Sequence, residues 1–281
     1  MTRDEEPLLI ERKLVVVFDI CSSTTILEDL KRTDNLPLWR NFIINLKNSL
    51  LLVSLDFDFI QYNFIGDGWV LLFPDNVPTD DLCHSLSTIS SLFSEDFAKL
   101  IRPSLSHEPA PNGLTFGIDS GDLIRVEMNE QREYLGRAIN VAARLQDYAR
   151  DLPGGPSYKA VFSPNSFYRP ALPTPTVEVE RHAVTLRNIT PPNMECFVFQ
   201  TLQPSGKASD ERVLNDDALA DKILSYARLM KQKHPNRVFE ESALCLELGV
   251  TAEQVARAMD ILYKRGRAKH SGHPGAWFIR P

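Results

Sequence analysis

A Gly-Asp-Gly turn between two apolar segments constrains this chain more than any other sequence feature. The stretch reads YNFIGDGWVLLF, residues 62–73, with aromatic and aliphatic residues on both sides of the turn. Glycine adopts the backbone conformations that tight turns need, and flanking β-forming runs are typical of a hairpin. We therefore predict a β-hairpin with Asp67 at its tip. Taken alone, that Asp is explained equally well as an ordinary turn residue.

A second apolar strand is predicted to end at another acidic residue. KLVVVFDI, residues 13–20, is a β-branched run that stops at a Ser/Thr cluster, as buried strands do. If it pairs with the hairpin, Asp19 and Asp67 meet at one end of the sheet. Two close carboxylates repel each other unless a cation lies between them. Such oxygen ligands suit Mg²⁺ or Mn²⁺, so the pair predicts a metal site.

The order of the remaining segments indicates an α+β domain. Helical spacing follows the first strand, and Pro37 divides residues 25–53 into two helices or one broken helix. A helix follows the hairpin, LTFGIDSGDLIRVEM is predicted as strand-turn-strand, and GRAINVAARLQDYAR as another helix. The expected order is β-α-β-β-α-β-β-α, completed by short strands as far as about Leu202.

The C-terminal part is predicted to be a separate small domain. The expected boundaries are a tail at 1–10, a main domain at 11–203, a polar linker at 204–211 and a winged-helix-like domain at 212–281. Its basic residues suit DNA phosphates; they are Arg257, Lys264, Arg265, Arg267 and Lys269. Acidic residues on the same helices oppose that role, so a protein-contact or dimer-supporting role is favoured and nucleic-acid binding stays open.

Composition and termini indicate a cytoplasmic protein. The four cysteines are scattered without C-x-x-C spacing, which is typical of a reducing compartment. The acidic N-terminus lacks the apolar core of a signal peptide, and no apolar run is long enough to span a bilayer. The net charge of −6 disfavours non-specific binding to polyanions such as nucleic acids as the main function.

Two polar clusters suit phosphate chemistry. ICSSTT precedes a predicted helix, whose start offers backbone N–H groups to a phosphate; the candidates are Cys21, Ser22, Ser23 and Thr24. Capping of the helix by Ser22 and Ser23 is the ordinary alternative. Asn140 and Arg144 are four residues apart and share one helix face. Arg can stabilise charge on a phosphoryl group and Asn can orient a sugar oxygen. Such a pair more commonly lies on the protein surface, in contact with solvent only.

Four motifs, in order and spacing, resemble the catalytic domain of class III nucleotide cyclases. They are FDICSST, NFIGDGWVLLF, GIDSGDL and YLGRAINVAARL, within residues 11–203. The resemblance implies a ferredoxin-like α+β domain that forms a head-to-tail homodimer with active sites at the interface. It implies that Asp19, Asp67 and the Ile20 carbonyl hold two Mn²⁺ or Mg²⁺ ions, while Asn140 and Arg144 come from the other subunit. The ribose 3′-hydroxyl would attack the α-phosphate, giving a 3′,5′-cyclic nucleotide and pyrophosphate.

The positions that read the base depart from the adenylate cyclase pattern. Asn63 stands where those enzymes usually have Lys, and Glu133 stands where they usually have Asp or Thr. Asn63 offers both a donor and an acceptor, which can match a uracil or cytosine edge, and neighbouring aromatics could narrow the pocket. Strand alternation predicts Tyr62 and Phe64 on one face and Asn63 on the other. Phe18 and Arg125 are further candidates, with core packing and a surface strand position as their ordinary explanations.

Because the residues that recognise adenine in adenylate cyclases are replaced by Asn63 and Glu133, the chain resembles the bacterial pyrimidine cyclases of the Pycsar anti-phage system. That resemblance implies synthesis of cyclic UMP or cyclic CMP, read by a separate effector, and we expect UTP to be preferred over CTP. The expected nucleobase-binding residues are Tyr62, Asn63 and Glu133. Two alternatives stay open. One is an adenylate or guanylate cyclase in ordinary signalling, and the other is a catalytically silent, nucleotide-sensing DNA-binding regulator.

Overall fold

The computed structural model divides the chain into two compact units. The first comprises residues 1–47 and 57–206, and the second comprises 48–56 and 207–281. The structure describes residues 8–107, 112–128, 131–153, 158–167, 179–199, 216–233, 237–248 and 250–280. The expected linker at 204–211 lies outside these residues. The expected tail at 1–10 does so in part, and its last two residues already belong to the first strand.

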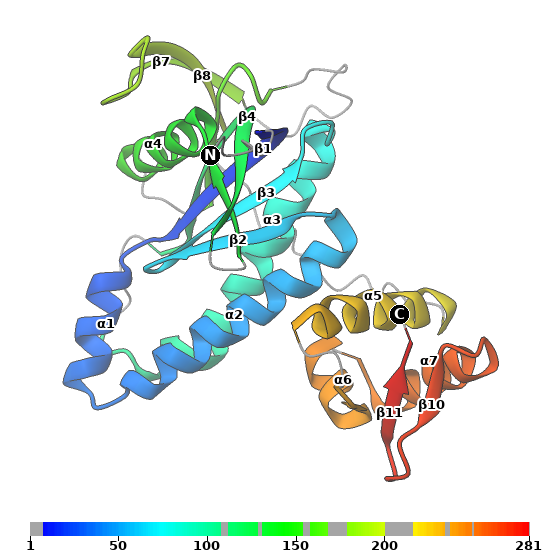
Figure 1. Ribbon diagram of the computed structural model, residues 1–281. Coiled ribbons are helices and arrows are strands. Elements are labelled where there is room, and N and C mark those ends of the chain that lie inside the picture. The colour runs from blue at the N-terminus through cyan, green and yellow to red at the C-terminus, as the bar shows by residue number, and fades with distance from the viewer. Residues whose placement is uncertain are drawn as a thin grey trace, which may run out of the picture. The chain divides into compact units, whose positions relative to one another are not determined.

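A mixed sheet forms the centre of the first unit (Figure 1). Its described strands lie in the order β2-β3-β1-β4-β6-β8-β7, with β5 pairing the far end of β4. The β4–β6 pair is parallel and the other pairs are antiparallel. The strands are β1 (Leu9–Ile20), β2 (Ile60–Ile65), β3 (Gly68–Pro74), β4 (Leu114–Met128), β5 (Gln131–Leu135), β6 (Lys159–Phe162), β7 (Val179–Thr185) and β8 (Asn193–Phe199).

Helices of this unit pack on the sheet through apolar side chains. They are α1 (Ser23–Arg32), α2 (Leu36–Phe57), α3 (Thr79–Asp96) with the short turns Phe97–Ile101 and Arg102–Ser104, and α4 (Arg137–Asp151). The small Ala138 and Ala142 of α4 pack over Val15 and Val17 of β1. A Cβ on Gly117 of β4 would lie 2.0 Å from the Ala142 carbonyl oxygen. The close packing of α4 on the sheet therefore depends on glycine at that position.

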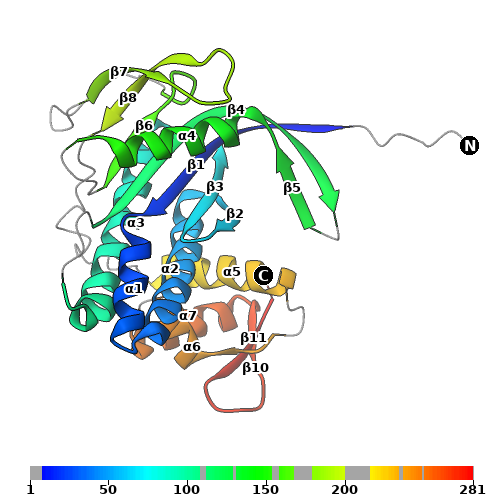
Figure 2. The same cartoon turned by 90° about the vertical axis from the view of Figure 1, so that its left-hand side faces the viewer.

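The helix break near Pro37 is confirmed, while the predicted turn inside LTFGIDSGDLIRVEM is wrong. Pro37 lies in the first turn of α2, where its missing N–H costs nothing. Residues 114–128 instead form one continuous strand, because β1 pairs with β4 without interruption from Leu114 to Arg125. This ladder satisfies the backbone of the Ser-Gly-Asp segment and overrides its local turn preference. The second hairpin lies further on, between β4 and β5 (Figure 2).

The second unit combines helices with a small antiparallel sheet of order β10-β11-β9. Its further elements are α5 (Asp216–Lys233), β9 (Phe239–Glu240), α6 (Glu241–Leu248), α7 (Ala252–Lys264), β10 (Ala268–His270) and β11 (Ala276–Ile279). Thr251 caps α7 in a reciprocal capping box with Gln254. Leu51, Leu52 and Leu55, from the second half of α2, pack against the core of this unit. By the boundaries predicted from the sequence, these α2 residues fall within the main domain at 11–203.

Among the residues that the structure describes, no helix is both long and apolar enough to cross a membrane.

Candidate active site

The structure brings Asp19 and Asp67 together at one end of the sheet. Asp19 lies near the end of β1, and Asp67 occupies the turn between β2 and β3. Phe18 pairs with Trp69 in the β1–β3 ladder, which places the turn beside Asp19. Burial, the negative charge of Asp67 and a hydrogen bond between the two carboxyl groups raise the pKa of Asp19 to about 7. The proximity predicted from two separate strands is therefore observed.

Gly68 permits this close approach. A Cβ at Gly68 would lie 2.2 Å from the Phe18 carbonyl oxygen and 3.1 Å from Oδ1 of Asp19. Gly66, on the other side of Asp67, has φ of +69°, a conformation that L side chains rarely adopt. Gly66 is thus needed for its positive φ and Gly68 for the close approach to β1. Together they allow the Asp67 carboxyl group to lie against Asp19.

The donor set fits a divalent cation. When both carboxyl groups are ionised, they expose hard oxygen donors whose repulsion a cation would relieve. The Ile20 N–H donates to the Asp19 carboxylate, and the expected use of the Ile20 carbonyl stays a prediction. In the described part of the chain, no three His, Cys, Asp or Glu side chains are grouped around a common point. The remaining ligands would have to be backbone oxygens, water and phosphate.

The predicted phosphate-binding segment, Cys21 to Thr24, lies at the end of β1 and the start of α1. The Cys21 N–H donates to the Gly113 carbonyl (3.0 Å), and burial raises the pKa of its thiol to about 12. The Cys21 N–H is therefore engaged within the chain, and a role of Cys21 toward phosphate stays a prediction. Ser22 is the N-cap residue of α1, and its side chain makes no capping hydrogen bond. Ser23 and Thr24 occupy the first turn of α1, where N–H groups lack intrahelical partners.

Asn140 and Arg144 lie on the exposed side of α4, opposite its buried residues. Arg144 forms an ion pair with Asp147, at 3.1 Å between Nη1 and Oδ2. Arg150, two turns further along α4, is the arginine whose charge lowers the pKa of Asp19, although burial has the larger effect. Sequence reasoning missed Arg150. The available signal was its place as the last residue of the predicted helix GRAINVAARLQDYAR.

The side chains of Tyr62 and Glu133, two of the predicted base-binding residues, contact each other within one copy of the chain. The Tyr62 hydroxyl donates to Oε2 of Glu133 at 2.7 Å and accepts from the Tyr134 N–H at 2.9 Å. A β-bulge lies between Gln61 and Asn63, so Asn63 is opposite Val70, which belongs to the cluster that Tyr62 contacts. Tyr62 and Asn63 therefore share a face of the sheet.

The alternation prediction for this strand was consequently wrong. Phe64, which was expected to share a face with Tyr62, is opposite Trp69 and contacts its ring at 4.8 Å. Phe18 is buried and packs against Trp69 and Phe116, which is core packing. Arg125 pairs with Glu11 at 2.8 Å, an ion pair between β4 and β1. Neither Phe18 nor Arg125 has a geometry that favours base recognition.

The GIDSGDL motif contributes a buried carboxyl group rather than a turn. Asp119 of β4 is almost fully buried, and the Ser163 hydroxyl donates to it. Burial raises the pKa of Asp119, while the Ser163 and Ser120 hydrogen bonds lower it. Ser163 in turn follows β6, which pairs with β4. Asp119 therefore ties the end of β6 to the middle of the sheet.

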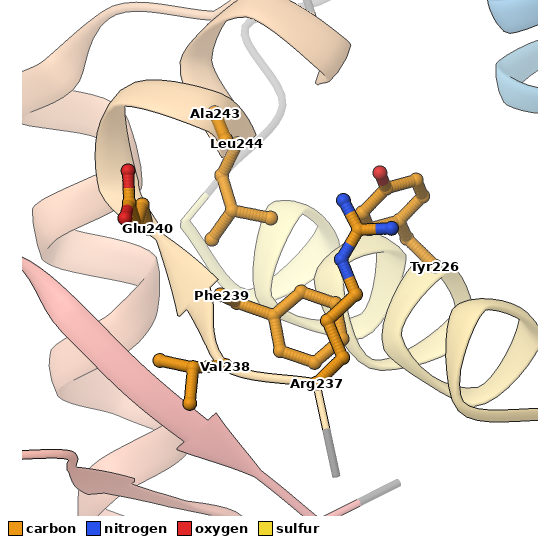
Figure 3. A pocket seen from close by; sticks show the side chains of 7 residues that line it. All are labelled: Tyr226, Arg237, Val238, Phe239, Glu240, Ala243 and Leu244. Atoms are coloured by element: carbon orange, nitrogen blue, oxygen red, sulfur yellow. The ribbon is translucent and has the colours of Figure 1, made fainter. Parts of the chain in front are cut away.

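A separate hollow of about 150 Å³ lies in the second unit (Figure 3). Phe239 and Leu244 supply apolar surface, and the Arg237 guanidinium lies 5.7 Å from the Phe239 ring centre. Its described lining residues include none of the predicted site residues.

Comparison of the structure with solved structures gives the fold of the first unit. The adenylyl cyclase CyaB from P. aeruginosa matches with a TM-score of 0.50 at 16% identity, over 69% of this chain and 97% of that one. The guanylyl cyclase Cya2 matches with a TM-score of 0.50 at 13% identity, over 73% and 98%. The chain has a nucleotide cyclase fold.

A bacterial light-regulated adenylyl cyclase also matches, with a TM-score of 0.51 at 17% identity. That alignment covers 72% of this chain and 55% of the light-regulated one, so only about half of that protein is matched. No known protein family matches the sequence, and no curated protein does. The mixed α+β architecture with helices flanking the sheet agrees with the fold predicted from the four motifs.

Without divalent cations, the free energy of unfolding is expected to fall as pH rises. The pKa of Asp19 is about 7 in the fold against 3.8 for a free side chain, so the folded chain binds more protons between these values. Stability is therefore lost as pH rises through this window. Between pH 5 and pH 8, with screening by solvent included, the expected loss is roughly 2 kcal/mol. Urea unfolding at pH 5 and pH 8 with a chelator measures the loss. Asp67→Asn should make the loss smaller, because it removes the charge of Asp67 but not the burial of Asp19. Equal pH dependence in both proteins would contradict the coupling.

Proposed function

We propose that the chain is a pyrimidine nucleotide cyclase that converts UTP, or CTP, to the 3′,5′-cyclic nucleotide and pyrophosphate. The observation that carries the proposal is the Asp19–Asp67 carboxyl pair at the sheet end of a nucleotide cyclase fold. Asp19, Asp67 and the Ile20 carbonyl would hold two Mn²⁺ or Mg²⁺ ions. When bound, these ions would activate the ribose 3′-hydroxyl and neutralise charge on the phosphates.

The protein groups have separate tasks in this proposal. Backbone N–H groups of Ser23 and Thr24, at the positive end of α1, would bind phosphate oxygens. Asn140 would orient the ribose, and Arg144 would stabilise charge on the α-phosphate. Both side chains are exposed on α4, and within the described residues neither forms a hydrogen bond or ion pair with Asp19 or Asp67. Their exposure supports a homodimer in which each site takes these two residues from the partner copy.

Pyrimidine preference rests on the base-reading positions. Asn63 replaces the lysine of adenylate cyclases and shares a face with Tyr62, which contacts Glu133. The specific alternative is a purine cyclase, because the matching solved structures are adenylyl and guanylyl cyclases. By its resemblance to the Pycsar enzymes, the proposed role is cytoplasmic synthesis of a second messenger in anti-phage defence, read by a separate effector.

The second unit is proposed to be a winged-helix domain that contacts protein. The order α5-β9-α6-α7-β10-β11 with a three-stranded sheet supports this interpretation. Its basic residues are largely paired: Arg257 with Asp216 and Glu253, Lys264 with Asp260, and Arg265 with Asp217 and Asp221. These ion pairs compete with DNA phosphates, which weighs against the silent DNA-binding regulator.

The test is to incubate the purified protein separately with ATP, GTP, CTP and UTP in Mn²⁺ and to identify products by mass spectrometry. We expect cyclic UMP as the main product, with cyclic CMP as the lesser one. Cyclic AMP or cyclic GMP as the main product would replace the pyrimidine assignment with the purine alternative. Turnover of none of the four would favour a nucleotide-binding module without catalysis.

A further inference from the structure

Tyr62 joins two strands that are not neighbours in the sheet. Strands β3, β1 and β4 lie between β2, which carries Tyr62, and β5, which carries Glu133 and Tyr134. The Tyr62 and Tyr134 rings also meet edge to face at 5.4 Å. The contact therefore crosses one face of the sheet instead of following its hydrogen-bond ladder.

The β-bulge in β2 makes this contact possible. Gln61 pairs with Leu71 and Asn63 with Val70, so Tyr62 is the extra residue without a partner in β3. Its side chain contacts a cluster that includes Val70 and Tyr134. In a regular strand, Tyr62 and Asn63 would lie on opposite faces. The bulge thus places a hydroxyl and an amide side by side near Glu133.

The hydrogen-bond capacity of the Tyr62 hydroxyl is filled within the protein. Its one hydrogen goes to Oε2 of Glu133 at 2.7 Å, with the Tyr134 carbonyl at 3.2 Å as the longer alternative. It accepts from the Tyr134 N–H. Burial raises the pKa of Tyr62, so the hydroxyl stays protonated and remains a donor at neutral pH. Tyr62 is therefore suited to hold Glu133 and not to bind a base directly.

Holding Oε2 changes what Glu133 can offer to a base. A free carboxylate accepts two parallel hydrogen bonds, as from the adjacent N1–H and N2–H of guanine. Each carboxylate oxygen has two lone pairs, so Oε2 still accepts, but it is a weaker acceptor once the Tyr62 hydroxyl donates to it. Oε1 is then the stronger acceptor, which suits a single donor such as the N3–H of uracil or the amino group of cytosine. The Asn63 amide, on the same face, can donate to a neighbouring base acceptor.

We propose that Tyr62 is a positioning residue that selects against guanine by fixing the Glu133 carboxylate and weakening one of its oxygens as an acceptor. This inference rests on the proposed function, because Glu133 reads the base only if the site binds nucleotides. Adenine presents one amino group at the corresponding edge, so the contact bears on GTP and not on ATP.

The test compares binding of 3′-deoxy-UTP and 3′-deoxy-GTP, which lack the nucleophile and are not cyclised. In Tyr62→Phe, the Kd ratio should shift toward the guanine nucleotide by about tenfold, the usual effect of one charge-assisted hydrogen bond. Tyr134→Phe is the matched control, since its hydroxyl faces Glu11 at 3.5 Å, and it should leave the ratio unchanged. In a Glu133→Gln background, Tyr62→Phe should shift the ratio much less.

Measuring binding and turnover separately distinguishes the role of Tyr62 from the proposed cyclase activity. A shifted Kd ratio in a protein that forms no cyclic product would support the role of Tyr62 and reject the cyclase assignment. An unchanged ratio in a Tyr62→Phe protein with wild-type melting temperature would overturn the role of Tyr62, even if cyclic UMP forms. Binding of neither nucleotide by the wild type would overturn both.

Discussion

Asp67→Asn is expected to lower kcat for cyclic-nucleotide formation on the order of 10³-fold or more while the protein stays folded. The substitution removes one of the two carboxylates that would hold the divalent cations. It also removes the negative charge that opposes ionisation of Asp19. The variant should therefore unfold at a higher urea concentration than wild type at pH 8 without divalent cations. Steady-state kinetics in Mn²⁺, together with urea unfolding, measure both effects.

Asp80→Asn is the matched control for this substitution. Asp80 is an exposed acid in the first turn of α3, within the same unit, and has no place in the proposed site. It should keep wild-type turnover. If Asp67→Asn retained most of the activity, the metal assignment of the Asp19–Asp67 pair would be wrong, whatever product the enzyme makes.

Two inactive variants are expected to restore activity when they form a mixed dimer. Arg144→Ala should be inactive because it loses the charge that stabilises the transition state, and Asp67→Asn because it loses a metal ligand. In a heterodimer, the Arg144→Ala chain supplies an intact carboxyl pair and the Asp67→Asn chain supplies an intact Arg144. Random pairing gives one competent site in half of the dimers, about a quarter of wild-type activity.

The matched control mixes Asp67→Asn with Asp19→Asn. Both substitutions damage the carboxyl pair, so neither site of that heterodimer is complete and no activity should return. Differently tagged chains, co-purified on both tags, would prove that mixed dimers form. Absence of activity in proven Arg144→Ala/Asp67→Asn heterodimers would contradict a site shared between two copies.

The sequence was sufficient to predict the Asp19–Asp67 pair because its signals are local. A β-branched run marks β1, and the Gly-Asp-Gly turn marks the hairpin between β2 and β3. Only one pairing, β1 with β3, was then needed to bring the acids together. The approach of α4 to the sheet could not be predicted in the same way, because it depends on which strand position lies beneath the helix.

Two other features depend on partners that are distant in the chain. Ser120, Gly121 and Asp122 are typical turn residues, yet pairing with β1 keeps them extended. Tyr62 leaves the alternating pattern because β3 has one residue fewer opposite the bulge. Both outcomes are set by strand register, and register is decided between strands and not within one.

The division of α2 between two cores was also absent from its sequence pattern. Phe42 and Leu46 are buried, and Phe42 packs against Phe93 and Phe97 in the first unit. Leu51, Leu52 and Leu55 pack against the core of the second unit. One continuous apolar periodicity runs along the helix, so it gives no sign of where one core ends and the other begins.

This sharing of α2 limits how the protein can be recombined. A gene fusion or natural crossover in the 204–211 segment would transfer residues 207–281 without residues 48–56, which belong to the same unit. The donated segment would then arrive without Leu51, Leu52 and Leu55, and without the Asp56 partner of Lys222. The C-terminal unit is therefore not an interchangeable cassette, because its transfer also needs the matching α2 residues 48–56.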